Sequence, residues 1–520
     1  MQAFANRPDR GGHVRGTSRR ARPSGIAFSA LTVLAWLACA GCSSGSGGGF
    51  GFVGGPGPAI ADNGGGPLQP TFSKTTIAST SPPPVSGGTL LVMNDGKHAV
   101  AADPARDAIY VVDLGAKSVL HTITLSTGDE PGRVAEDGAG HVHVALRGGG
   151  AVVTIDPLEG SILARRSACP APRGVTWDPS SNLLWVACAT GELVSMPAAG
   201  GGPITQTTVE RDLRDVIVNN GTLSVSTFRS AEVLRLSFGG AVARRDALPS
   251  PDTQFAPHVA WRSIAGPSGS VISVHQASTT QSLSTMVQGG YGGGGGCASF
   301  GISSSSGGGV FGSGQGALSG PGDDGGADAA SPVPTGTASG PGCFTTVDAL
   351  VNKSSSPMFG PVGPSPCGPE SGAVKGVLTV VASDGTVTVN QEFPGVLPVD
   401  VAVSRDGLHV AAVATGNAFT QNLSTVVEFD GCGAPALNAP TSTLQATAVA
   451  FDAHDDVVMQ TREPASLVVF PSNGGTSTTI PLSTDSRADT GFDIFHTQAG
   501  GMIACGSCHP DGGDDGHVWV

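Results

Sequence analysis

Short runs of β-branched and aliphatic residues recur along the chain, separated by turns of Asp-Gly, Asn-Gly or Asp-Pro. Runs of this length and composition are typical of β-strands, and no sustained 3.6-residue period accompanies them to indicate long helices. The clearest unit holds four such runs, at 174–179, 183–187, 192–196 and 204–209. The pattern therefore predicts an all-β protein built from four-stranded sheets.

The four-stranded unit recurs along the chain at a nearly constant interval. Its first strand can be anchored at one valine per unit, in the order Val92, Val134, Val175, Val216, Val259, Val401 and Val449. These valines are 42, 41, 41, 43, 142 and 48 residues apart. Four-stranded units with a period of about 40–45 residues indicate a β-propeller. We therefore predict a seven-bladed β-propeller over 88–486. A pair of β-sandwiches is the alternative, and the constant period argues against it.

Two low-complexity segments interrupt this pattern. A Gly- and Ser-rich block at 288–342 falls inside the one oversized interval, so we expect it to be an insertion into the fifth blade. Strands at 376–381 and 386–389 would then complete the interrupted sheet. The other segment, 43–87, is rich in Gly, Ser and Pro and is predicted to be a flexible tether.

The charge of the chain excludes one class of partner. Only 13% of the residues are charged, and the formal net charge is −14. Proteins that bind nucleic acid present basic surfaces, because they must neutralise phosphates. We therefore expect no nucleic-acid partner.

The N-terminus has the composition of an export signal. Six arginines and a single acid, Asp9, precede an apolar run at 26–38, and small residues follow that run. This order is typical of a secretory signal. The apolar run is shorter than the roughly 20 residues that a transmembrane helix needs. Residues 1–42 are therefore predicted to be a signal segment.

The end of this segment, Ala40-Gly41-Cys42, resembles the processing site of bacterial lipoproteins. The resemblance implies that Cys42 becomes the lipid-bearing first residue of the mature protein. Cys39 is the second choice, and ordinary signal cleavage is the alternative. The expected location is then outside the cytoplasm, lipid-anchored in the cell envelope, in the periplasm or at the outer membrane.

The remaining cysteines are consistent with an oxidising compartment. Cys169 and Cys188 flank one turn-and-strand unit of the repeat, and we predict a disulfide between them. Four further cysteines permit three pairings that the sequence does not separate; they are Cys297, Cys343, Cys367 and Cys432. Unpaired buried thiols are the alternative.

The segment that carries chemistry is Cys505-Gly506-Ser507-Cys508-His509. C-x-x-C-H is the attachment signature of c-type haem, in which two thiols bond the porphyrin and the adjacent histidine ligates the iron. The rival interpretations are a thiol redox pair and half of a zinc site. A redox pair usually lies in a βαβ pattern, which this sequence lacks, and a zinc site needs a second pair of ligands.

Two resemblances extend these predictions. The phrases at 109–114 and 401–407 resemble the YVTN-type seven-bladed propellers of secreted bacterial proteins, which supports the fold but not a function. Residues 491–495, 505–509 and 510–512 resemble the start of a cytochrome c domain, and more specifically the first haem segment of di-haem cytochrome c peroxidases.

The second resemblance implies that haem c is the cofactor. In that comparison Cys505 and Cys508 form the haem thioethers, and His509 is the proximal iron ligand. Residues 487–520 would then be an incomplete cytochrome c-like segment. Its length is below the roughly 40 residues at which a domain usually sustains its own core.

The tail departs from the cytochrome family after the motif. Cytochrome domains continue for many tens of residues, whereas this chain stops at Val520, and none of its seven methionines follows His509. The resemblance therefore implies C-terminal truncation and an exposed, poorly enclosed haem. His496 and His517 are weak candidates for a sixth ligand, and we expect each of them to be a solvated loop histidine.

Two further groups of residues are weaker candidates. His258 and His275 fall on the first two predicted strands of the interrupted blade, where inner strands line the channel of a propeller. They could face a ligand, but hydrogen-bonded structural roles are expected. Asp511, Asp514 and Asp515 fit no EF-hand spacing, so a solvated acidic turn is expected rather than a calcium site.

Three function classes follow from these observations. The first is a cell-envelope haem protein that transfers electrons to a redox partner protein, with the propeller as docking platform. The second is a propeller scaffold lipoprotein with a vestigial tail. The third is a fragment of an enzyme, a peroxidase-like oxidoreductase. Because that chemistry uses two haems and the sequence has one C-x-x-C-H motif, the third class ranks lowest.

Overall fold

The computed structural model describes the chain from residue 72 to residue 519, with internal gaps. The described residues are 72, 74–250, 253–281, 283–285, 300–302, 373–420, 424–430, 435–438, 444–499 and 502–519. Several sequence predictions concern residues outside these ranges: the signal segment with Cys42, most of the tether, most of the insertion, and Cys297, Cys343, Cys367 and Cys432.

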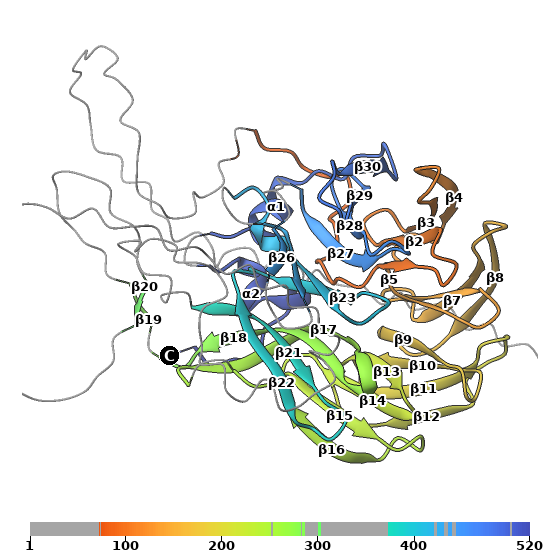
Figure 1. Cartoon of the computed structure of the whole chain (residues 1–520), viewed down its shortest axis with the longest axis horizontal. Helices are drawn as coiled ribbons and strands as arrows, with labels where there is room; N and C mark the ends of the chain where they lie inside the picture. The colour runs from red at the N-terminus through yellow and green to blue at the C-terminus, as the bar shows by residue number, and fades with distance from the viewer. Residues whose placement is uncertain are drawn as a thin grey trace, which may run out of the picture. The chain divides into compact units, whose positions relative to one another are not determined.

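The described residues form seven four-stranded antiparallel sheets, which are the blades of a propeller (Figure 1). Blades one to four are β1–β4 (Leu90–Val92, His98–Asp103, Ala108–Asp113, Ser118–Thr124), β5–β8 (Pro131–Glu136, Val142–Leu146, Ala151–Asp156, Ser161–Ser167), β9–β12 (Pro172–Asp178, Leu183–Cys188, Glu192–Pro197, Thr205–Thr208) and β13–β16 (Leu213–Asn219, Thr222–Thr227, Glu232–Leu236, Val242–Ala247).

The other three blades complete the ring. They are β17, β18, β21 and β22 (Phe255–Ala265, Val271–Thr279, Val374–Val381, Val387–Phe393), β23–β26 (Pro398–Val403, His409–Ala414, Val426–Asp430, Pro435–Asn438) and β27–β30 (Ala446–Phe451, Val457–Thr461, Ser466–Phe470, Thr478–Pro481). The predicted seven-bladed propeller is confirmed. Every valine used as an anchor lies in the first strand of its blade.

The fifth blade is interrupted as the sequence predicts. Its sheet has the order β17-β18-β21-β22, so the chain leaves the blade after the second strand and returns for the third. Between these strands, β19 (Leu283–Thr285) and β20 (Phe300–Ile302) pair with each other in a separate two-stranded sheet. The long interval is therefore an insertion into a regular blade and does not mark a missing one.

Burial differs between the inner and outer strands of a blade. The second strand of blade two, β6, is buried at all five positions, whereas the outermost strand, β8, is mainly exposed. Inner strands pack on neighbouring blades with both faces, which explains their almost continuous apolar character. In the blades whose outermost strand has described burial, that strand is the more exposed one.

The ring closes through an apolar contact between its first and last blades. One buried cluster contains Ala101 and Tyr110 from blade one together with Val458 and Leu467 from blade seven. In Figure 1 the blue strands of blade seven lie beside the orange strands of blade one. Each of these two blades consists of four consecutive strands, so neither blade contains a strand from the other end of the chain. The ends of the ring are therefore joined by side-chain packing.

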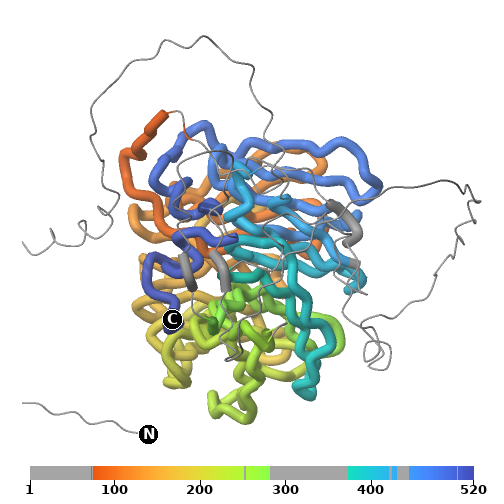
Figure 2. Tube along the Cα trace, turned by 90° about the vertical axis from the view of Figure 1, so that its left-hand side faces the viewer, coloured from red at the N-terminus to blue at the C-terminus, as the bar shows by residue number. Residues whose placement is uncertain are grey.

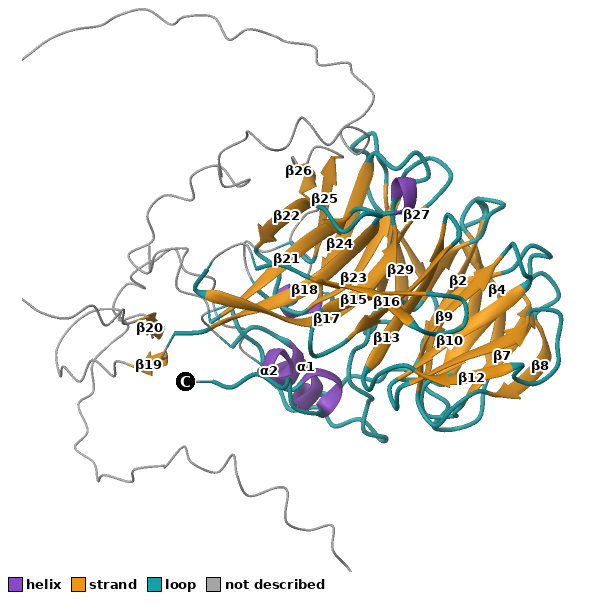
Figure 3. Ribbon diagram, turned by 90° about the horizontal axis from the view of Figure 1, so that it is seen from below, coloured by secondary structure: helices purple, strands orange, loops and turns teal. Residues whose placement is uncertain are grey.

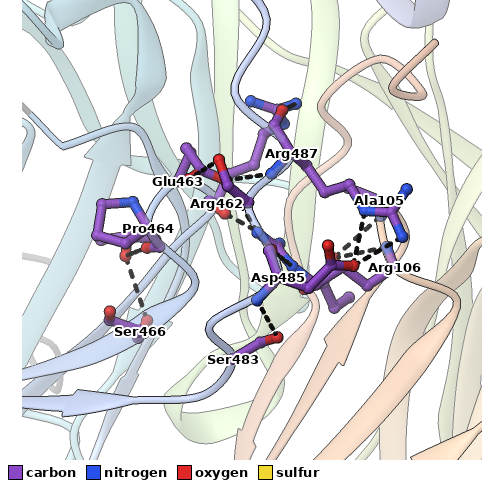
Figure 4. A network of polar contacts seen from close by, with 12 residues as sticks. Ala105, Arg106, Arg462, Glu463, Pro464, Ser466, Ser483, Asp485 and Arg487 are labelled. Atoms are coloured by element: carbon purple, nitrogen blue, oxygen red, sulfur yellow. Dashed lines mark hydrogen bonds and ion pairs between the residues drawn. The ribbon is translucent and has the colours of Figure 1, made fainter. Parts of the chain in front are cut away.

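Arg106 adds a polar connection across the same seam (Figure 4). Its guanidinium donates hydrogen bonds to the Asp485 carbonyl at 2.7 Å and the Arg462 carbonyl at 3.2 Å. It also contacts the carboxylates of Asp103 at 2.9 Å and Glu463 at 2.8 Å. Only 3% of the Arg106 side chain is exposed, and its ion pair with Asp103, which is 7% exposed, lies largely out of water.

Two helices follow the last blade and lie side by side at one face of the strands (Figure 3). They are α1 (Thr490–His496) and α2 (Cys505–Cys508). The short 3-10 helices are η1 (Pro267–Gly269), η2 (Thr415–Asn417) and η3 (Pro510–Gly512). The Asp489 carboxylate caps α1 by accepting a 2.8 Å hydrogen bond from the Phe492 amide. Among the described residues, no helix has the length and apolar character needed to cross a membrane.

The residues before the first blade run alongside this tail (Figure 2). The Thr490 amide donates to the Thr76 carbonyl at 2.9 Å, and the Ala78 amide donates to the Asp489 carboxylate at 3.0 Å. The two ends of the described chain are therefore joined by hydrogen bonds on one face of the propeller.

Candidate haem-attachment site

The C-x-x-C-H motif divides into an exposed side and a buried side. Cys505 and His509 are exposed and Cys508 is partly buried, and both cysteines have free thiols. The two residues between the cysteines, Gly506 and Ser507, are buried against the propeller. One helical turn therefore presents the reactive side chains outward while its two small residues make the contact beneath.

The turn between the two cysteines packs closely on the propeller. A Cβ atom at Gly506 would lie 3.2 Å from a methyl group of Leu397 and 3.5 Å from the ring of Phe495. The Ser507 carbonyl accepts a 3.0 Å hydrogen bond from the side-chain amide of Gln276, on β18. Gln276 is held in turn by the indole N–H of Trp261, on β17, at 3.0 Å. The motif thus docks on the inner strands of the fifth blade.

Apolar packing supports the same contact. Phe492 and Ala504 from the tail belong to one buried cluster with Val85, Leu397 and Trp261. The 34-residue tail therefore shares the core of the propeller and does not need one of its own.

The ring of His509 has one nitrogen engaged and one available. Its Nδ1 lies 3.1 Å from the Gly513 carbonyl, to which it donates as the Nδ1–H tautomer. Nε2 has no hydrogen-bond partner among the described residues. Metal-ligating histidines almost always donate their other ring N–H to a carbonyl or carboxylate in this way. The residues present therefore fit a covalently attached haem, with the thiols of Cys505 and Cys508 and Nε2 of His509 as the groups that would hold it.

The Cys508 thiol is held in its neutral form in this arrangement. Burial raises its pKa to about 12, with the Asp515 carboxylate adding to the effect. Within the described ranges, no cluster of three or more His, Cys, Asp or Glu side chains is arranged to bind a metal ion. A neutral, partly buried sulfur is compatible with a thioether.

Asp511, two residues beyond His509, inserts its carboxylate among arginines of the propeller. It lies 2.5 Å from Arg214 and 3.6 Å from Arg173. Burial alone would raise the pKa of Asp511, but the charges of Arg214, Arg173 and Arg147 lower it below its usual range. Asp511 is therefore ionised at neutral pH. It is not the solvated acidic-turn residue expected from sequence.

A buried charge network continues from these arginines around the axis of the propeller. Asp215 accepts from Arg133 at 2.7 Å and from Arg262 at 2.5 Å. Arg262 also lies 3.2 Å from Asp400, which accepts from the Val449 amide at 3.0 Å. These residues come from the first strands of blades two, four, five, six and seven, so the network connects most of the ring at its centre.

The segment before the first blade enters the same network. The carbonyls of Ser86 and Gly87 accept hydrogen bonds from Arg133, and the Ser86 hydroxyl accepts from Arg214 at 2.9 Å. The backbone of Gly87 has a φ of +66°, and a Cβ there would overlap the Val399 carbonyl, so glycine is required. Packing on the propeller therefore begins inside the predicted tether 43–87.

The four candidate histidines have different surroundings. His275 is fully buried and contacts Thr379 Oγ1 at 3.0 Å, and burial lowers its pKa to about 4, which fits the structural role expected for it. His258 lies 3.0 Å from the Asp515 carboxylate, so it faces the tail. His517 contacts the Thr279 carbonyl at 3.1 Å through Nε2.

His496 is not a solvated loop residue, because it ends α1 and is 4% exposed. Its Nδ1 donates to the Phe492 carbonyl at 2.9 Å, and its Nε2 accepts from the Val85 amide at 3.3 Å. With both nitrogens engaged, it is unsuited to ligate iron in this arrangement. The Asp515 carboxylate is also held, by His258 and by the indole N–H of Trp519 at 3.1 Å.

Cys169 and Cys188 form a disulfide in the structure. Cys188 ends β10, and Cys169 lies just before β9, so the bond joins the start of the third blade to its second strand. It is distant in sequence from the haem motif and belongs to the scaffold.

The residues that dock the motif were missed by sequence reasoning: Arg173, Arg214, Gln276 and Asp511. One signal could have indicated the arginines. In four successive blades an arginine lies within three residues of the anchored valine, namely Arg133, Arg173, Arg214 and Arg262. Arginine at an inner strand position is unusual enough to indicate a buried charge partner.

Comparison with known proteins adds little about this site. No family model matches the chain, and no curated protein matches it by sequence. The hydrazine synthase of Kuenenia stuttgartiensis matches over 80% of this chain and 100% of its own, at 12% identity and a TM-score of 0.47. A streptogramin B lyase matches over 74% of this chain and 93% of its own, at 9% identity and a TM-score of 0.44. Neither likeness bears on the residues of the motif.

Proposed function

We propose that this protein is a c-type haem protein of the cell envelope that transfers electrons to a partner protein. The observation that carries the proposal is the arrangement of the motif. Cys505 and His509 are exposed, their thiol and Nε2 are unengaged among the described residues, and the turn beneath them is docked on the propeller. A bound haem would supply one-electron redox chemistry at this position.

The role of the propeller in this proposal is to hold the haem segment. A segment of this length does not usually sustain its own core. Here Phe492 and Ala504 pack into the core of the propeller, and Ser507 accepts a hydrogen bond from Gln276. Because Cys505 and His509 are exposed, a haem held there would be accessible to a partner protein. Electron transfer needs such access and no substrate pocket.

Export and lipid anchoring complete the proposal. C-type haem is attached outside the bacterial cytoplasm, and the predicted signal 1–42 with Cys42 as lipid site would place the chain there. The expected test is incorporation of labelled palmitate into the wild-type protein and its loss in Cys42→Ala. Labelling that persists in Cys42→Ala would exclude this lipid site.

The test of haem attachment is co-expression with a c-type maturation system, followed by a pyridine haemochrome spectrum of the purified protein. We expect about one covalent haem per wild-type chain and none in Cys505→Ala/Cys508→Ala. Covalent haem should survive acid–acetone extraction, which removes haem that is merely adsorbed. Absence of covalent haem from the wild-type chain would refute the proposal and favour a scaffold lipoprotein.

A further inference from the structure

A pocket of about 200 Å³ lies beside the haem motif, between the tail and the propeller. It is lined by Arg173, Ala189, Asp212, Leu213, Arg214, Phe228, Arg229, Asp511 and Gly513. Its volume is below the roughly 300 Å³ at which sites for drug-sized ligands begin, so it suits a small group. Gly513 links it to the motif, because its carbonyl accepts from His509.

The charges that line this pocket do not balance. Arg173, Arg214 and Arg229 face only Asp212 and Asp511, which leaves one positive charge uncompensated. The charge of Arg214 is compensated by Asp511 at 2.5 Å, and Arg214 also donates to Ser86, while its buried Nε has no hydrogen-bond partner. Arg229 is satisfied by Asp212 at 2.6 Å and by the Asp514 carbonyl at 2.6 Å.

The uncompensated charge is on Arg173. Its guanidinium makes no hydrogen bond to any described residue, and its one ion pair, with Asp511, is long at 3.6 Å. Yet its side chain is only 21% exposed. None of its nitrogens is among the fully buried polar atoms that lack a partner, so the guanidinium still reaches water and is available to a ligand in the pocket.

We propose that this pocket binds a carboxylate group, with Arg173 as the residue that recognises it. A carboxylate carries the single negative charge that the lining lacks, and its two oxygens match the planar fork of arginine. The carboxylate has two possible sources, a propionate of a haem attached at Cys505 and Cys508 or a small free carboxylate. The first source rests on the proposed function, and the second does not.

The experiment is isothermal titration with succinate, performed on haem-loaded wild-type protein and on haem-free Cys505→Ala/Cys508→Ala. We expect the haem-free protein to bind succinate. Arg173→Gln in that background should weaken binding at least tenfold, and Arg173→Lys, which keeps the charge but loses the fork, should weaken it less. Arg165→Gln replaces an arginine outside the pocket and is the matched control. Succinamide, the neutral diamide, should not bind.

The haem-loaded protein separates the two sources. If a propionate fills the pocket, succinate will not bind until the haem is absent; if the ligand is a free carboxylate, both proteins will bind it. If no haem attaches to the wild-type chain, titration of the haem-free protein still tests whether the pocket binds a carboxylate. The proposal is overturned if the haem-free protein does not bind succinate, if Arg173→Gln binds it unchanged, or if inorganic phosphate binds equally well.

Discussion

The Asp511 carboxylate lies 2.5 Å from the guanidinium of Arg214, a residue 297 positions earlier in the chain. Asp511 follows the proximal histidine candidate by two residues, and Arg214 lies on the first strand of blade four. This ion pair therefore connects the haem motif to the axis of the propeller. Arg214 also donates a hydrogen bond to Ser86. Arg214 therefore contacts both the segment before the first blade and the segment after the last one.

Replacing Asp511 with Asn should release the tail. Removal of one partner from a buried ion pair leaves the other charge uncompensated, which typically costs about 3–5 kcal/mol. We expect hydrogen exchange at α2 to accelerate strongly while the blades remain protected. Asp514→Asn is the control, because Asp514 is exposed and contacts Arg229 only through its carbonyl. Equal protection of α2 in both variants would show that Asp511 does not anchor it.

The contact between His496 and Val85 should make stability depend on pH. Burial, aided by nearby Arg462, lowers the pKa of His496 to about 4 against the opposing effects of the Phe492 carbonyl and Asp511. Because the folded pKa is below the unfolded value of about 6.5, the contribution is fully present above pH 6.5 and is lost as the pH falls toward 4. Protonated Nε2 can no longer accept from the Val85 amide.

The full effect of protonating His496 is on the order of 3 kcal/mol, from a shift of about 2.5 pKa units. Urea unfolding of wild type and His496→Gln at several pH values measures it. His143 and His275 also have pKa values of about 4, so both proteins should lose stability in acid, wild type more than the variant. Parallel curves would exclude His496 as a source of the pH dependence.

Arg106→Ala should loosen the closure of the ring. The substitution removes the hydrogen bonds to two carbonyls and leaves the 7% exposed carboxylate of Asp103 without its cation, whereas Glu463 keeps its contacts with Ser486 and Arg487. Breaking a buried charge network of this kind costs about 3–5 kcal/mol. We expect lower stability to urea and faster proteolysis at the seam. Arg245→Ala, which replaces a 47% exposed arginine paired with the partly exposed carboxylates of Glu210 and Glu232, should change the unfolding free energy by less than about 1 kcal/mol.

Removing the Cys169–Cys188 disulfide should destabilise the third blade. The bond closes a loop with a sequence separation of 19, for which the chain-entropy model gives about 3 kcal/mol. Thermal unfolding of Cys169→Ser/Cys188→Ser should show this loss, and adding reductant should destabilise the variant less than it destabilises the wild type. Wild-type protein whose stability is insensitive to reductant would contradict the prediction.

The blades were predictable because they are local. Each strand is indicated by a few alternating or continuous apolar residues that are followed by a turn residue. The period of the repeat can therefore be counted from the sequence without knowledge of any tertiary contact. The interruption in blade five was equally visible, since the strands at 374–381 and 387–393 carry the same pattern as their counterparts. The C-x-x-C-H motif was likewise readable, because its chemistry depends on residues adjacent in sequence.

The docking of that motif was decided by the tertiary structure alone. From the sequence, Asp511 was expected to belong to a solvated acidic turn. In the structure it is a largely buried ion, because ring closure brings Arg214 and Arg173 to the axis. Ser507 and Gln276 are 231 residues apart and carry no pattern that relates them. Ion pairs and hydrogen bonds between distant residues depend on three-dimensional position. A repeat period specifies how many blades form, but it does not specify which side chains meet at their centre.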